Sequence, residues 1–205
     1  MKKHIQIIAG LFLLLSTTML RAQDPGIKIL QSVAESLKKH KNIEVTFTAY
    51  IKEESGSPYE KKDGVVYIQA DAYKMVFDDM ELICDGKTHW TYYIEDQEVM
   101  VGNATEDNNI SLYYKLLTES TGGFQGTDDD GNSVVALYNK DEYYQDIDLI
   151  IDEKGNLKRI DFFGDYKEAI MKLELHSFKF DQTFKEGFFS FDEKAHPDVE
   201  INDMR

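Results

Sequence analysis

The sequence predicts a mainly β domain built on one large, strongly curved antiparallel sheet with few helices to cover it. Three observations predict this fold class. Apolar and polar residues alternate with a period of two in several segments. Turn-forming residues separate these segments. The chain also holds 12 Tyr and 12 Phe but only 3 Pro, a composition typical of strands.

The first 22 residues have the features of a secretory signal peptide. Two lysines precede an apolar run over residues 5–15, and Ala22 suits the last position before the cut, although Leu20 is larger than the usual residue at its place. The alternative is a membrane anchor, but the run is shorter than the ~20 residues that span a bilayer. We therefore expect residues 1–22 to be removed and the mature protein to lie in the periplasm of a Gram-negative bacterium.

Length and charge limit the classes of partner. The 205 residues are 42% hydrophobic and 30% charged, which suits one domain with a real core, and we assign it to residues 23–205. The net charge of −15 becomes −18 when Lys2, Lys3 and Arg21 leave with the signal. Such a polyanion is repelled by phosphate backbones, so no nucleic-acid partner is expected. It also disfavours adsorption to anionic membranes and favours a basic docking patch on a partner.

The mature chain opens with a predicted helix over residues 25–40. Asp24 can cap its first N–H groups, Pro25 suits the first position, and Leu30 and Leu37 belong to an apolar stripe at helical spacing. Strands are predicted next over residues 43–51, 73–77, 89–94 and 146–151, and a second, short helix near residues 109–119. Turns are expected at residues 56–58, 78–79, 85–86, 95–96, 130–132, 153–156 and 164–165.

A wide curved sheet has an apolar inner face that two short helices cover only in part. The remainder is either packed by other protein or left as a cavity for an apolar ligand.

The search for catalytic and metal-binding motifs is negative. The histidines are far apart in sequence, and a metal site is not expected. Cys84 lies in an apolar strand beside Asp85, a context that raises the pKa of a thiol. The acidic run at residues 128–130 lacks the ligand spacing of a calcium loop and is interpreted as a solvated turn. We therefore predict no enzyme and no cofactor.

One segment is more specific. Residues 84–92 read CDGKTHWTY, in which Asp-Gly is a tight hairpin turn. The segment resembles the (S)DGKTxWxY signature of the LolA-type periplasmic outer-membrane lipoprotein carriers. Four further segments are similar to family motifs in the same order, and together they span essentially the whole mature chain: residues 43–48, 64–68, 147–160 and 189–201.

The resemblance implies an incomplete, half-open antiparallel β-barrel covered by a helical lid. It also implies a function: a carrier (chaperone) that binds the acyl chains of lipoproteins in an apolar cavity. The expected partners are the acylated lipoprotein cargo, an inner-membrane lipoprotein-releasing ABC transporter and an outer-membrane acceptor, with only transient membrane contact.

One departure from the family concerns lid control. The family has an Arg-Pro pair after the strand that corresponds to residues 64–68, and its Arg is thought to hold the lid closed. Here Gln69 or Ala70 stands at that position and no Pro is present. Gln has fewer hydrogen-bond donors than Arg and no charge. Control of the lid by this Arg therefore cannot be carried over from the family to this chain.

Eight apolar or aromatic side chains are the candidates to line the cavity, with ordinary core packing as the alternative for each. The strand residues are Phe47, Met75, Trp90 and Tyr92, and the helix residues are Leu30, Leu37, Tyr113 and Leu117. Methionine suits a moderate, adaptable grip on a chain.

Two other functions stay open. The protein is alternatively a periplasmic carrier or sensor for another lipid or glycolipid, or a secreted β-domain with a solid core that binds protein. A hydrolase that uses an acidic pair ranks last, since nothing in the sequence marks out a nucleophile or a matched base.

Overall fold

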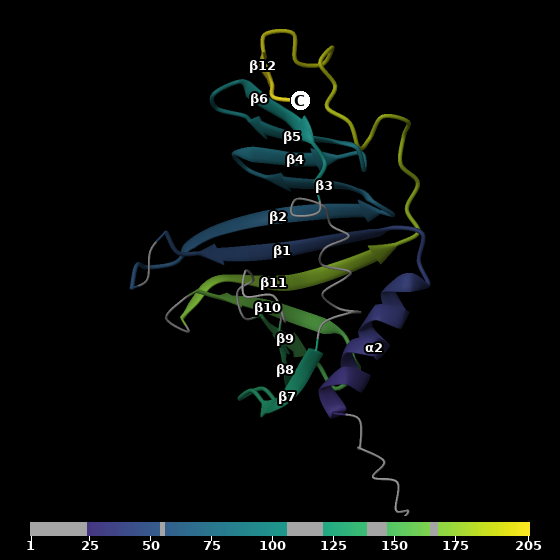
Figure 1. Ribbon diagram of the computed structural model, residues 1–205, viewed down its shortest axis with the longest axis vertical. Coiled ribbons are helices and arrows are strands. Elements are labelled where there is room, and N and C mark those ends of the chain that lie inside the picture. Colours follow the sequence, from purple (N-terminus) through teal and green to yellow (C-terminus); the bar gives the residue numbers. More distant parts are fainter. Residues whose placement is uncertain (1–23, 54–55, 106–120, 139–146, 165–167) are drawn as a thin grey trace, which may run out of the picture.

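The computed structural model describes residues 24–53, 56–105, 121–138, 147–164 and 168–205 (Figure 1). This part of the chain forms one helix and twelve strands. In chain order they are α2 (Pro25–Lys38), β1 (Ile43–Ile51), β2 (Glu60–Gln69), β3 (Ala72–Phe77), β4 (Met80–Cys84), β5 (Thr88–Tyr93), β6 (Glu98–Asn103), β7 (Thr121–Thr127), β8 (Ser133–Tyr138), β9 (Ile147–Ile151), β10 (Leu157–Phe163), β11 (Ala169–Phe180) and β12 (Glu200–Asp203).

All twelve strands belong to one open sheet, which confirms the predicted fold class. Their spatial order is β12-β6-β5-β4-β3-β2-β1-β11-β10-β9-β8-β7, and the stack is seen from top to bottom in Figure 1. Neighbouring strands are antiparallel except for β12, which pairs with β6 in parallel. The sheet does not close, so β12 and β7 are its two edges.

The predicted elements agree with the structure to within a few residues. The helix ends at Lys38 rather than at residue 40, and the four predicted strands correspond to β1, β3, β5 and β9. Each predicted turn lies between two of the strands. The turn between β2 and β3 was not predicted, because it rests on Ala70 in a left-handed conformation (φ 50°), which alanine seldom adopts. The second predicted helix lies outside the described residues.

Two hairpins of the lower half use the same turn, D-x-x-G-N. In the β9–β10 turn, Asp152 Oδ1 accepts from the backbone N–H groups of Lys154 (2.9 Å) and Asn156 (2.8 Å). The β7–β8 turn repeats this pattern, with Asp128 Oδ1 at 2.8 Å from Asn132 N. The side-chain amides of Asn132 and Asn156 also donate to these carboxylates, at 3.1 Å and 2.9 Å. These side-chain hydrogen bonds are the main cause of the lowered pKa of both aspartates, and the backbone donors add to it. The acidic run at residues 128–130 is thus part of a turn, as predicted.

Helix α2 covers one end of the sheet. Asp24 Oδ1 caps it by accepting from Gly26 N at 2.7 Å. Its buried stripe includes Leu30 and Val33, which pack into a core with Val135 of β8 and Leu149 of β9. The helix contacts β7 and β8, so it lies over the lower half of the sheet in Figure 1.

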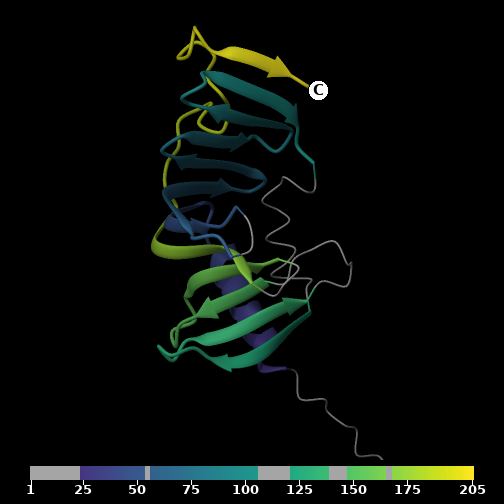
Figure 2. The same cartoon turned by 90° about the vertical axis from the view of Figure 1, so that its left-hand side faces the viewer.

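A long segment, residues 181–199, covers the other end of the sheet; we call it the strap. It leaves the end of β11, runs along β2 to β6 and delivers β12 to the far edge (Figures 1 and 2). Phe184 and Phe188 of the strap stack on each other with centroids 4.6 Å apart. Both meet the ring of Tyr67 edge-on, at 5.8 and 5.1 Å.

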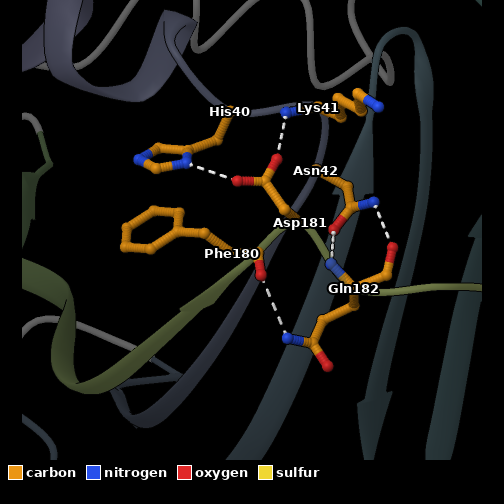
Figure 3. Close-up of polar contacts among 6 residues, drawn as sticks. All are labelled: His40, Lys41, Asn42, Phe180, Asp181 and Gln182. Atoms are coloured by element: carbon orange, nitrogen blue, oxygen red, sulfur yellow. Dashed lines mark hydrogen bonds and ion pairs between the residues drawn. The ribbon is translucent and has the colours of Figure 1, made fainter.

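The strap begins at a polar junction with the segment that joins α2 to β1 (Figure 3). His40 Nδ1 lies 2.9 Å from Asp181 Oδ2, and Lys41 N donates to Asp181 Oδ1 at 2.8 Å. The buried Asn42 side chain donates to Gln182 O (2.8 Å) and accepts from Gln182 N (2.7 Å). The hydrogen bond from His40 is the main cause of the lowered pKa of Asp181. The segment that follows the end of α2 and the start of the strap are therefore held together.

Candidate functional site

The strand register defines a continuous row of side chains across the upper half of the sheet. Residues directly opposite each other in an antiparallel pair point to the same face. The pairs Val45–Val66, Val66–Met75, Met75–Leu82 and Leu82–Thr91 form this row, and Met100 follows Thr91. The row runs from β1 to β6 and becomes polar only at Thr91.

A second row on the same face is aromatic at its centre. The Phe47 ring lies over Gly64 of the neighbouring strand, where a Cβ atom would come within 2.7 Å of Phe47 Cζ. Gly64 is therefore required for this close approach. Phe47 also meets the Phe77 ring edge-on, with centroids 5.6 Å apart. Met80, two residues before Leu82, extends the apolar surface on β4.

The same face carries α2 at the other end of the sheet. Register links Leu173 of β11 through Ile160 to Leu149 and Val135, and these last two pack under α2. Leu173 packs against both the α2 core and the cluster around Phe47. We call this surface the helix-side face. Rows of apolar side chains continue across it from β8 to β4, with Glu60 and Lys62 as charged residues at one end of β2. Helix α2 contacts it at β8.

The opposite surface, which we call the outer face, has a core of its own under the strap. Ile83, Tyr92, Val99 and Val101 are buried there together with Phe191 of the strap. Tyr92 lies 5.2 Å from Phe191, centroid to centroid. The strap thus covers the upper half of the sheet on the face opposite to the one that α2 covers in the lower half.

The structure divides the predicted cavity residues between these two faces. Phe47 is buried and Met75 half-buried on the helix-side face. Leu30, which is buried, and Leu37, which is half-buried, belong to α2 and pack against this face. Trp90 and Tyr92 instead lie on the outer face, in the core under the strap. These two therefore do not share a face with the other four. Tyr113 and Leu117 lie outside the described residues.

Two ionisable side chains lie on the helix-side face beside the first row. Cys84 and His89 pair across β4 and β5. Burial raises the pKa of the Cys84 thiol, the direction that the sequence predicts, and burial lowers the pKa of His89. Both groups are thereby held neutral near pH 7, as suits an apolar surface.

Sequence reasoning missed a polar cluster on the outer face. The buried Thr48 hydroxyl donates to Asp63 Oδ1 at 2.6 Å and lies 2.7 Å from His176 Nε2. A register shift opposite Thr46 and Phe47 leaves His176 as an extra residue in β11, so no sequence motif marks it. Because the Thr48 proton points to Asp63, His176 does not act as its base, and the cluster lacks the order of a nucleophile–histidine pair.

Gln69, one of the two residues that stand where the resembled family has Arg, ends β2. Its Oε1 atom lies 3.5 Å from Asn42 Nδ2, at the long limit of a hydrogen bond. Gln69 therefore contacts the α2–β1 segment through an uncharged amide. The polar junction of Asn42 with Gln182 is shorter and links the same segment to the strap instead.

Within the described ranges, no group of three or more His, Cys, Asp or Glu side chains could hold a metal ion. Over the same ranges, no helix has the length and apolar character needed to cross a membrane.

No protein-family model matches the chain, and no curated protein matches its sequence. Solved structures do match. An uncharacterized conserved protein from Thermus thermophilus superposes with a TM-score of 0.56 at 13% identity, covering 84% of this chain and 98% of that one. This match shows a shared fold and assigns no activity.

Two further matches bear names from the resembled family, at lower scores. One is a putative outer membrane lipoprotein-sorting protein domain from Vibrio parahaemolyticus, with TM-score 0.44, 12% identity and coverage of 80% and 96%. The other is a LolA superfamily protein from Nitrosomonas europaea, with TM-score 0.41, 8% identity and coverage of 79% and 97%. At these scores and identities, neither match assigns a family or a function to this chain.

Proposed function

We propose that this protein is a non-enzymatic carrier of the cell envelope that shields acyl chains of lipoproteins on its helix-side face. It takes them from an inner-membrane ABC transporter and delivers them to the outer membrane. The observation that carries the proposal is the set of apolar side chains that continues from β8 to β4 on the helix-side face, which α2 contacts at β8. The secretory signal features and the resemblance of residues 84–92 to the carrier signature support it.

The energetics of carriage suit this surface. Each acyl CH₂ group removed from water contributes about 0.8 kcal/mol, so a chain laid across several strands is held without a covalent bond. The half-buried Met75, Met80 and Met100 lie on this face. Methionine side chains adapt to irregular partners. This favours binding of moderate strength, from which the acyl chain can be released. Phe47 and Met75 are the strand residues that we retain from the sequence prediction as lipid contacts, and Leu30 and Leu37 are the helix residues.

The first experiment compares a synthetic triacylated lipopeptide with the same peptide without acyl chains, titrated into the mature protein. We expect a soluble one-to-one complex with the acylated form alone. In the double variant Met75→Gln/Met100→Gln, the dissociation constant should rise about tenfold, since two apolar contacts become polar at similar volume.

Val76→Thr is the matched control for these substitutions. Val76 is also half-buried and follows Met75 on β3, but its side chain points to the outer face, opposite Val65 and Glu81. It should bind the lipopeptide as the unsubstituted protein does. Equal weakening in both variants, with thermal unfolding unchanged, would show that the helix-side face is not the binding surface.

The second experiment tests carriage itself. Inner-membrane vesicles that contain the transporter and an acylated lipoprotein are incubated with the mature protein, and lipoprotein in the supernatant is measured. Release that needs the protein and fails with the double methionine variant supports the proposal. If only a small lipid co-purifies and no lipoprotein is released, the protein is a carrier of another lipid. If no apolar ligand binds at all, it is a protein-interaction module.

A further inference from the structure

The helix-side face changes from apolar to polar and acidic along its length. Strands β1 to β4 contribute side chains such as Val45, Met75 and Leu82, whereas β5 contributes Thr91 and His89. The strand pair β6 and β12 ends the face with carboxylates. An amphiphile that lies across the strands would therefore place its chain over β1 to β4 and its polar head towards β12.

Two glutamates define the charge at that end. Glu98 and Glu200 are directly opposite each other in the parallel β6–β12 pair, so both side chains lie on the helix-side face. Asn202 Nδ2 donates to Glu98 Oε1 at 2.5 Å, which orients one carboxylate. Glu200 is exposed and Glu98 half-buried.

The described strands of the upper half carry little positive charge on this face, and that charge is paired with carboxylates of the same chain. Among the strand residues of β1 to β6 and β12 that point to the helix-side face, Lys62 is the single lysine or arginine. Its Nζ atom lies 2.7 Å from Asp79 Oδ2 and 3.6 Å from Glu60 Oε1. The hydrogen bond with Asp79 is the main cause of the raised pKa of Lys62, so its charge is held by two acids of this chain.

We propose that the helix-side face selects amphiphiles whose polar head carries no negative charge. The head lies beside Glu98 and Glu200, and an alkyl chain covers β1 to β4. This inference rests on the proposed function and narrows its substrate class: amide-linked or otherwise uncharged acylated groups bind, and free fatty acids or acidic lipids are rejected by like charge.

N-lauroylglycinamide and N-lauroylglycine test this, because they share one chain and nearly one shape and differ by an amide against a carboxylate. Both are titrated calorimetrically into the mature protein at about pH 8, where the carboxylate is ionised. At about 0.02 M salt we expect the amide to bind about fivefold or more tightly than the carboxylate. At about 0.5 M salt this gap in affinity between the two amphiphiles should shrink, because salt screens the repulsion of the carboxylate and leaves the apolar contacts unchanged.

The double variant Glu98→Gln/Glu200→Gln should reduce the low-salt gap to less than about twofold by improving carboxylate binding. The control Asp129→Asn/Asp130→Asn removes the same charge from the β7–β8 turn at the other end of the sheet and should keep the gap. Equal affinities in the unsubstituted protein, or a gap that closes equally in both variants, would overturn the inference and leave the carrier intact. Failure of both amphiphiles to bind would overturn the carrier function as well.

Discussion

His89 is an ionisable residue of the helix-side face whose pKa is changed by burial. It pairs with Cys84 on β4 and with Gly102 on β6, and its ring lies 6.3 Å from that of Tyr73. A Cβ atom at Gly102 would meet nothing within 4 Å, so there is open space beside the imidazole. Burial lowers the pKa of His89 from 6.5, and the folded protein therefore holds it neutral at lower pH than the unfolded chain does.

This difference makes His89 a source of acid sensitivity. As pH falls below 6.5, the unfolded chain takes up a proton at this histidine before the folded protein does, so the free energy of unfolding decreases. In His89→Gln that loss is removed. We expect the drop in melting temperature between about pH 7.5 and about pH 5 to be smaller in the variant. An identical drop in both proteins would contradict the burial of this imidazole.

Asp24 joins two elements at the lower edge of the sheet. Its Oδ1 atom caps α2 and also accepts from Phe124 N of β7 at 3.1 Å. That N–H belongs to an edge strand, and an unpaired edge is a site for pairing with other chains. A bulge between Phe124 and Gly126 disrupts the edge further. The helix start and the strand edge thus protect each other.

Asp24→Ala should remove both hydrogen bonds at once. We expect a loss of about 1–2 kcal/mol in the free energy of unfolding by denaturant, the upper range for an N-cap, because an edge N–H also loses its partner. Asp24→Asn keeps an acceptor oxygen at the same place and should cost much less. Similar losses for the two variants would show that the cap contributes through charge and not through its hydrogen bonds.

The elements themselves were largely predictable, whereas the pairing of faces was not. Alternation and turn residues locate β1, β3, β5 and β9 because both signals are local. Alternation also shows that Trp90 and Tyr92 lie on the same face of their own strand. Which residues of the neighbouring strands lie on that face depends on the strand register, which alternation does not give. The short turns between β3, β4 and β5 put Ile83, and not Leu82, opposite Trp90, which places Trp90 on the face away from Met75.

The strap could not be predicted from local signals. It has no regular hydrogen-bond ladder, and its aromatic residues at 184–191 have neither helix nor strand period. Its course depends on contacts with residues distant in sequence, such as Tyr67 and Tyr92. The resemblance of residues 189–201 to a closing family motif identified a family-like end without indicating that β12 pairs in parallel with β6.

At the scale of the whole molecule, each cover element has a core beneath it, and these two cores lie on opposite faces of the sheet. One lies under α2 and involves β8 to β10, and the other lies under the strap and involves β4 to β6. Each cover contacts one half of the sheet, and the β1–β11 pair joins the halves with a long antiparallel ladder. The two halves should therefore respond separately to the loss of a cover contact.

A matched pair of substitutions tests that separation. Phe191→Ala under the strap and Leu30→Ala in α2 each remove a buried side chain, at a cost of about 2–5 kcal/mol. Native-state hydrogen exchange should show faster exchange in β4 to β6 for Phe191→Ala and in β8 to β10 for Leu30→Ala. The same set of amides accelerated by both variants would mean that the sheet opens as one unit.

The strap has a further consequence for biogenesis, because it follows β1 to β11 in the chain. Ile83, Tyr92, Val99 and Val101 can meet Phe191 only after nearly all of the polypeptide has been synthesised. Until then one surface of the nascent sheet presents aromatic and aliphatic groups to water, and such surfaces aggregate. A chain stopped before residue 181 is therefore a natural client for a holding chaperone or a protease.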